Sequence, residues 1–112
     1  MSELEKVEAM IAGLSRGEKA QLLQWVANDL GESFPGIDSK PGVMGGAASI
    51  VRTRIPVWVL VQAHKMGASE IDLLKAYPYL RAEDLANAWA YYRSHRREID
   101  DLIAANEREE AA

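Results

Sequence analysis

The chain has 112 residues, a net charge of −4 and no cysteine. This length indicates one domain with an appended arm, and the lack of cysteine excludes disulfides, a thiol nucleophile and a thiolate zinc site. The N-terminus is acidic and amphipathic, and no apolar run has the length of a leader or a membrane span, so we expect a cytoplasmic protein with no membrane contact.

The charge is unevenly distributed along the chain. Residues 1–40 carry a net charge of −3, residues 41–97 carry +4 and residues 98–112 carry −5. A basic middle beside an acidic end favours nucleic-acid contact by one part and a protein partner for the other. Two solvated faces explain the same distribution, and charge alone does not decide between them.

The first 31 residues are predicted to form an arm of two helices. One apolar stripe recurs at helical spacing through Leu4, Val7, Ile11 and Leu14. Ser15 and Glu18 have the spacing of a capping box that begins a second helix, and Gly31 is a natural stop for it. Two short amphipathic helices cannot bury their stripes alone, so they must pack on each other and on the rest of the chain or a second copy. Together with a short hairpin they expose more apolar surface than one trihelical core can cover, so we expect a homo-oligomer, a dimer or higher.

Residues 32–55 are predicted to be a linker followed by a short β-hairpin. Phe34 and Ile37 are expected to attach the linker to a core. Apolar residues flank Gly45-Gly46, which predicts a hairpin with strands at residues 43–44 and 48–51. Walker A spacing is absent, so the glycine pair is interpreted as a turn rather than as a phosphate loop.

Residues 56–97 are predicted to form a core of three helices. Pro56 suits the first helical position, because its missing N–H would have no partner there. The second helix covers Glu70–Ala76 with Ser69 as its cap. The third begins near Ala82 and is predicted to run without a break into an acidic extension over residues 98–112. The far end of that extension is expected to face a partner or to be frayed.

A short helix, a tight turn and a longer helix, braced by a preceding helix, are the layout of a helix-turn-helix module. Arginine and asparagine suit base edges, and arginine and lysine suit phosphates. This gives five candidate DNA-binding residues: Arg54, Lys75, Arg81, Asn87 and Arg93. Glu83 and Asp84 at the start of the third helix oppose phosphate binding. Trihelical packing also occurs in pure interaction domains, so the residues leave both functions open.

Other residues suit contact with a protein partner. The candidates are an aromatic residue of the arm and residues of the C-terminal helix: Trp25, Glu98, Asp101 and Ile103. Removing residues 98–112 is expected to abolish partner binding and to leave DNA binding intact. The two histidines, His64 and His95, are far apart and have no second ligand at metal spacing. We therefore expect no enzyme activity, no metal and no cofactor.

A set of motifs between Pro41 and Tyr92 resembles the family called domain of unknown function 433. The matching residues are Pro41, Val43, Gly45, Gly46, Ile50, Thr53, Arg54, Ile55, Pro56, Val57, Gly67, Tyr77, Pro78, Leu80, Glu83 and Asp84. The chain departs from the family pattern at three places. Arg52 replaces a glycine, Ala47-Ala48 replaces a more polar pair, and Arg81 replaces a Thr or Ser cap.

This resemblance implies a mainly α fold: a three-helix, homeodomain-like helix-turn-helix core, preceded by a short β-hairpin and an N-terminal two-helix arm. It also implies an antitoxin that neutralises a PIN-like ribonuclease toxin and represses its own operon by binding operator DNA. The alternative is a homo-oligomeric interaction module without nucleic-acid binding.

Overall fold

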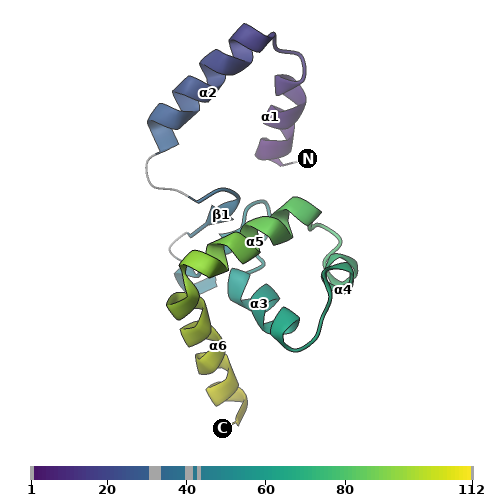
Figure 1. Cartoon of the computed structure of the whole chain (residues 1–112), viewed down its shortest axis with the longest axis vertical. Helices are drawn as coiled ribbons and strands as arrows, with labels where there is room; N and C mark the ends of the chain where they lie inside the picture. The colour runs from purple at the N-terminus through teal and green to yellow at the C-terminus, as the bar shows by residue number, and fades with distance from the viewer. Residues whose placement is uncertain (1, 31–33, 40–41, 43, 112) are drawn as a thin grey trace. The chain divides into compact units, whose positions relative to one another are not determined.

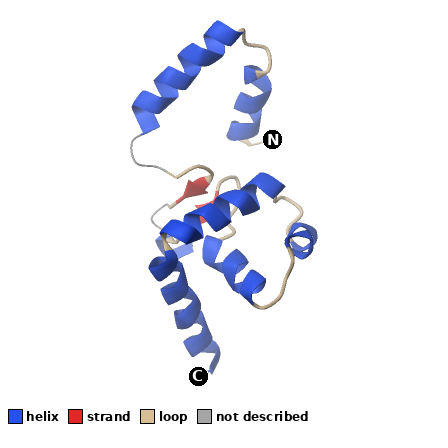
Figure 2. Cartoon of the chain, viewed as in Figure 1, coloured by secondary structure: helices blue, strands red, loops and turns tan. Residues whose placement is uncertain are grey.

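The computed structural model describes residues 2–30, 34–39, 42 and 44–111. The fold is mainly helical, with one short pair of antiparallel strands, as predicted (Figures 1 and 2). The chain divides into two compact units, Met1–Ser33 and Phe34–Ala112. None of the described helices is long and apolar enough to cross a bilayer.

The first unit contains the two predicted helices, α1 (Glu3–Ile11) and α2 (Arg16–Leu30). Both begin with a reciprocal capping box. Ser2 Oγ accepts from the Glu5 amide at 3.2 Å, and Ser15 Oγ accepts from the Glu18 amide at 3.1 Å, while each glutamate accepts from its serine amide. Neither helix contains a buried residue. The predicted stop at Gly31 lies outside the described residues.

The strand pair differs from the predicted hairpin. The strands are β1 (Ile37–Asp38) and β2 (Ser49–Ile50), paired as Ile37 with Ile50 and Asp38 with Ser49. Met44–Gly46 forms a 3₁₀ turn instead of a strand and its turn, and Val43 lies outside the described residues. The reason is burial: Ile50 is fully buried, and Phe34 and Ile37 pack against the same core, as expected for those two residues.

Residues 51–56, after β2, form a turn and run back beside β2 before the first core helix begins. Thr53 Oγ1 donates to the Ile50 carbonyl at 2.8 Å and accepts from the Ile55 amide at 3.0 Å, which closes the turn. Arg52 has φ +68°, the left-handed region in which glycine is favoured. Pro56 is extended and buried, and it lies one residue before the helix instead of in its first position.

The second unit contains the expected trihelical arrangement. Its helices are α3 (Val57–Lys65), α4 (Glu70–Ala76) and α5 (Ala82–Ser94). The spacing of the apolar residues directs one stripe of each helix inward, and the core contains Val57, Leu60, Val61, Leu73, Leu80, Leu85 and Ala88. Ser69 caps α4, with its hydroxyl accepting from the Asp72 amide at 3.1 Å.

The predicted continuous third helix is wrong. It breaks at His95, and α6 (Arg96–Ala111) leaves α5 in a new direction (Figure 1). Ser94 Oγ and His95 Nδ1 both contact the Tyr91 carbonyl, at 3.2 and 3.0 Å, so these side chains occupy an acceptor at the end of α5. After the break, α6 packs against α3, and Ile99 and Ile103 complete the core. Residues 98–112 therefore begin as part of the domain, and not as an appended extension.

Candidate nucleic-acid and partner interface

Aromatic contacts brace the helix-turn-helix pair. Trp89 of α5 donates its indole N–H to Glu70 Oε1 of α4 at 3.0 Å. The His64 ring of α3 stacks on Trp89 with centroids 4.9 Å apart. Leu80, in the turn between α4 and α5, is 7% exposed. These contacts fix α3, α4 and α5 relative to each other.

One of the two acids that were expected to oppose phosphate binding is neutralised. Asp84 is 3% exposed, and Arg52 Nη2 lies 2.8 Å from its Oδ2 and 3.0 Å from its Oδ1. Asp84 Oδ2 also accepts from the Arg81 amide at 2.8 Å, which satisfies the first turn of α5. Of the two acids at this helix start, only Glu83 therefore presents a carboxylate to solvent.

Two of the candidate base-reading residues are engaged within the protein. Arg81 Nη1 lies 3.3 Å from Glu83 Oε1. The Asn87 amide lies against the turn before β1, since a Cβ built on Gly36 would come within 2.4 Å of Asn87 Nδ2. Base readout by Asn87 would require this side chain to leave the β1 turn.

The remaining candidate cations are exposed. Lys75 lies in the last turn of α4 and Arg93 in the last turn of α5. Across the described ranges, Lys75, Arg93 and Arg54 take part in no ion pair. Arg81 and Arg93 are twelve residues apart, about 18 Å along the helix, so they would contact different phosphates.

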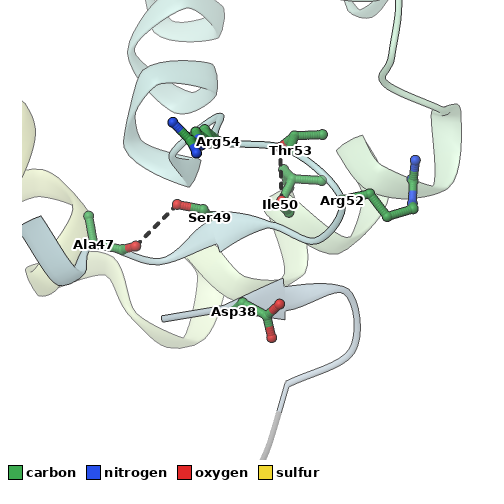
Figure 3. Close-up of a pocket in the computed structure, with 7 residues that line it drawn as sticks. All are labelled: Asp38, Ala47, Ser49, Ile50, Arg52, Thr53 and Arg54. Atoms are coloured by element: carbon green, nitrogen blue, oxygen red, sulfur yellow. Dashed lines mark hydrogen bonds between the residues drawn. The ribbon is translucent and has the colours of Figure 1, made fainter. Parts of the chain in front are cut away.

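Arg54 borders a hollow of about 250 Å³ between the strands and the turn that follows them (Figure 3). Asp38, Ala47, Ser49 and Thr53 are among the other lining residues. Arg52 and Arg54 extend to opposite sides of the turn in this view, so Arg52 stabilises α5 while Arg54 stays available to a ligand. Asp38 and Arg54 both line this hollow but form no ion pair with each other.

A second, wider groove of about 550 Å³ runs between the 3₁₀ turn, α3 and α6. Trp58 of α3 is half-buried and lines it together with Glu98 and Asp101 of α6. Tyr91 Oη donates to Glu98 Oε2 at 2.6 Å, and burial, followed by this contact, raises the pKa of the Tyr91 phenol. The groove thus combines an aromatic ring with two carboxylates, which suits a cationic side chain.

The candidate partner residues fall into three groups. Glu98 and Asp101 meet in the α6 groove. Ile103, expected at a partner surface, is 7% exposed and belongs to the core, so the expectation that it meets a partner directly is wrong. Trp25 lies on α2 in the first unit and is 64% exposed. Trp58 was not predicted, because its helical apolar spacing is that of an ordinary core residue.

Asp100 fastens α6 to its neighbours beside this groove. Its Oδ1 lies 2.9 Å from Lys65 Nζ and accepts from Tyr92 Oη at 2.8 Å. These two contacts, that of Lys65 first, lower the pKa of Asp100. Among the residues whose placement is described, no three His, Asp or Glu side chains gather in a way that could hold a metal ion.

The fold defines a small helical protein built on a helix-turn-helix-like core, and comparison with known proteins gives the family. The profile of the family described as protein of unknown function (DUF433) matches residues 37–92. A crystal structure of a DUF433 member protein from Anabaena variabilis ATCC 29413 is similar, with 40% sequence identity and a TM-score of 0.63. The match covers 93% of this chain and 99% of that one. No curated protein matches. The chain belongs to the DUF433 family.

Proposed function

We propose that this chain is an antitoxin-like protein without catalytic activity. It binds operator DNA through the α4–α5 pair and a PIN-like ribonuclease toxin through the α6 groove. The observation that supports DNA binding best is the neutralisation of Asp84 by Arg52, because it compensates a negative charge at the start of α5. Lys75, Arg93 and Arg54 are exposed and form no ion pair within the described residues. The positive end of the α5 dipole then faces the DNA.

The toxin surface follows from charge and shape. A ribonuclease must present cationic side chains to RNA phosphates, and the α6 groove offers Glu98 and Asp101 beside the Trp58 ring. Inhibition is then steric, since a protein seated on the basic cleft excludes RNA. The acidic residues further along α6, Glu107, Glu109 and Glu110, extend the same negative charge.

DNA binding is tested by a salt titration with the DNA upstream of the gene. Each phosphate contact steepens the fall of log affinity with log salt by about 0.9, so Lys75→Ala and Arg93→Ala should each reduce the slope by about 1. Arg16→Ala, which removes an exposed arginine of the arm, is the matched control. Absence of binding at low salt, or slopes that none of the variants changes, would exclude this part of the proposal.

Toxin binding is tested without removing α6, because deletion of residues 98–112 would take Ile99 and Ile103 out of the core. Asp101→Lys reverses a charge in the groove and should weaken neutralisation of the proposed PIN-like ribonuclease partner. Glu109→Lys makes the same charge change near the end of α6 and should weaken it less. Equal effects of the two variants would show that net charge matters and that the groove does not.

One observation favours a second function, a homo-oligomeric interaction module that does not bind nucleic acid. Asn87 is held against the β1 turn and Glu83 remains exposed, so the outer face of α5 lacks a free base-reading amide. This function predicts no salt-sensitive DNA binding at all. The titration above therefore separates the two functions.

A further inference from the structure

The arm carries most of the exposed apolar surface. Seven of the ten large apolar side chains that are exposed in the described part of the chain belong to α1 and α2: Leu4, Val7, Met10, Leu23, Trp25, Val26 and Leu30. The other three, Met66, Ile71 and Tyr79, are scattered over the end of α3, α4 and the α4–α5 turn. These three do not form a stripe along one helix.

These side chains form stripes. Leu23, Val26 and Leu30 recur at intervals of three and four residues along one face of α2, and Leu4 and Val7 do the same on α1. The two helices diverge from their connecting turn, so neither covers the stripe of the other (Figure 1). Helices of nine and fifteen residues are marginal in water by themselves, and their stability depends on burying such stripes.

The exposed area has the size of one half of an interface. The seven side chains present on the order of 400 Å² of apolar surface. One half of a standard protein–protein interface buries about 800 Å², of which somewhat more than half is apolar. An arm is therefore large enough to form a stable interface with a second arm.

The charges of α2 indicate the orientation of the pair. Lys19 lies in the first half of the helix and Asp29 near its end, and neither forms an ion pair within the ranges that the structure describes. If two α2 helices lie antiparallel and cross at the level of residue 24 along their axes, each Lys19 lies opposite the other copy's Asp29. The same register places each Val26 opposite the other copy's Leu22, a half-buried apolar residue beside the stripe.

We propose that the arm is a dimerisation element, in which α1 and α2 of two copies form a two-fold, four-helix bundle with antiparallel α2 helices. The partner that covers the stripe is a second copy of this chain. The inference does not depend on DNA or toxin binding, so it stands or falls separately from the proposed function.

The first test is the mass of the full-length protein by light scattering after size exclusion, at about 50 µM. A dimer is expected. Val26→Glu places a charge in the stripe and should raise the dissociation constant at least 100-fold. Gln24→Glu adds the same charge on the opposite face of α2 and should leave the dimer intact. A monomeric wild type, or a Val26→Glu protein that stays dimeric, would overturn the proposal.

The second test uses charge complementarity, which an unfolded arm cannot mimic. Lys19→Asp and Asp29→Lys place like charges opposite each other, and each should weaken the homodimer several-fold. An equimolar mixture of the two variants should form a heterodimer, because every opposed pair is then of opposite sign. A mixture no more dimeric than its components would overturn the antiparallel pairing.

Discussion

Arg52 and Asp84 lie 32 residues apart in sequence and meet in a buried ion pair in which one guanidinium nitrogen contacts both carboxylate oxygens. Arg52 occupies a left-handed backbone position, with φ +68°, a region that favours glycine. The strain of a non-glycine residue at such a position is about 1 kcal/mol. The ion pair and the capping of α5 by Asp84 offset that strain, which explains why an arginine is tolerated there.

Two substitutions of Arg52 should therefore separate the contribution of the ion pair to the free energy of unfolding from that of the backbone strain. Arg52→Ala leaves Asp84 buried without a cation and should lower the free energy of unfolding by about 3 kcal/mol. Arg52→Gly loses the same pair but relieves the strain, so it should be more stable than Arg52→Ala by about 1 kcal/mol. Urea denaturation measures both differences.

The control for Arg52 is its near neighbour. Arg54 is exposed and makes no ion pair in the described part of the chain, so Arg54→Ala should change stability by less than about 0.5 kcal/mol. Equal stability of Arg52→Ala and Arg52→Gly would show that the positive φ angle carries no strain.

Gly36 and Asn87 form a second contact between the strand region and α5. Gly36 has φ +74°, and an added Cβ would lie 2.4 Å from Asn87 Nδ2. Gly36→Ala should therefore cost about 2 kcal/mol, from backbone strain and from displacement of the amide. Because the Asn87 side chain can rotate, the combination with Asn87→Ala should recover part of this loss in a double-mutant cycle.

Gly45→Ala serves as the comparison for Gly36. Gly45 has φ +67° and open space where a Cβ would lie, so this substitution should show the strain alone, about 1 kcal/mol. If Gly36→Ala costs no more than Gly45→Ala, the Asn87 contact does not restrict the position.

Ile103 tests whether α6 belongs to the domain. The side chain is 7% exposed and packs in the core beside Ile99. Ile103→Ala should lower the free energy of unfolding by about 3 kcal/mol, because the loss of the side-chain carbons beyond Cβ leaves a cavity and removes apolar contacts. Glu107→Ala, at an exposed position of the same helix, should change it by less than about 0.5 kcal/mol. A similar small change for Ile103→Ala would mean that α6 is an independent extension.

The sequence was sufficient for the elements that carry their own local signals. The caps at Ser15 and Ser69 and the apolar stripes of α3 to α5 are encoded within a few residues, so their positions were predicted. The capping box at Ser2 was not predicted, although it has the same local spacing. The helix break at His95 was not predicted, because neither glycine nor proline marks it in the sequence. It depends on Ser94 and His95 side chains and on the burial of Ile99 and Ile103 by α3, which are tertiary effects.

The same distinction applies to the strands and the site. A glycine pair predicted the hairpin locally, but Ile50 pairs with Ile37 from the supposed linker because both contact one core. Exposed lysines and arginines were candidates for DNA contact by type alone. Their environments separate them: Arg81 contacts Glu83, while Lys75 and Arg93 have no ion-pair partner in the part of the chain that is described.

Tyr91 should make the second unit less stable as the pH rises into the alkaline range. Burial, followed by the hydrogen bond to Glu98, raises the pKa of its phenol above the ordinary value of 10.0. The native state then holds the phenolic proton more tightly than the unfolded state does. This contribution to stability is complete below about pH 10 and is lost as the pH rises through the raised pKa.

Substitution of Tyr91 should remove that dependence. Tyr91→Phe should be less stable than wild type by about 1 kcal/mol at neutral pH, because the bond to Glu98 is lost. Between about pH 9 and about pH 11 the wild-type free energy of unfolding should fall more steeply than that of the variant, so that the two curves converge. Tyr79→Phe removes a hydroxyl from a side chain that is 81% exposed and should follow the wild-type curve. Parallel curves for wild type and Tyr91→Phe would show that the Tyr91 proton is not held by the fold, and that Glu98 is free to meet a partner without breaking an internal contact.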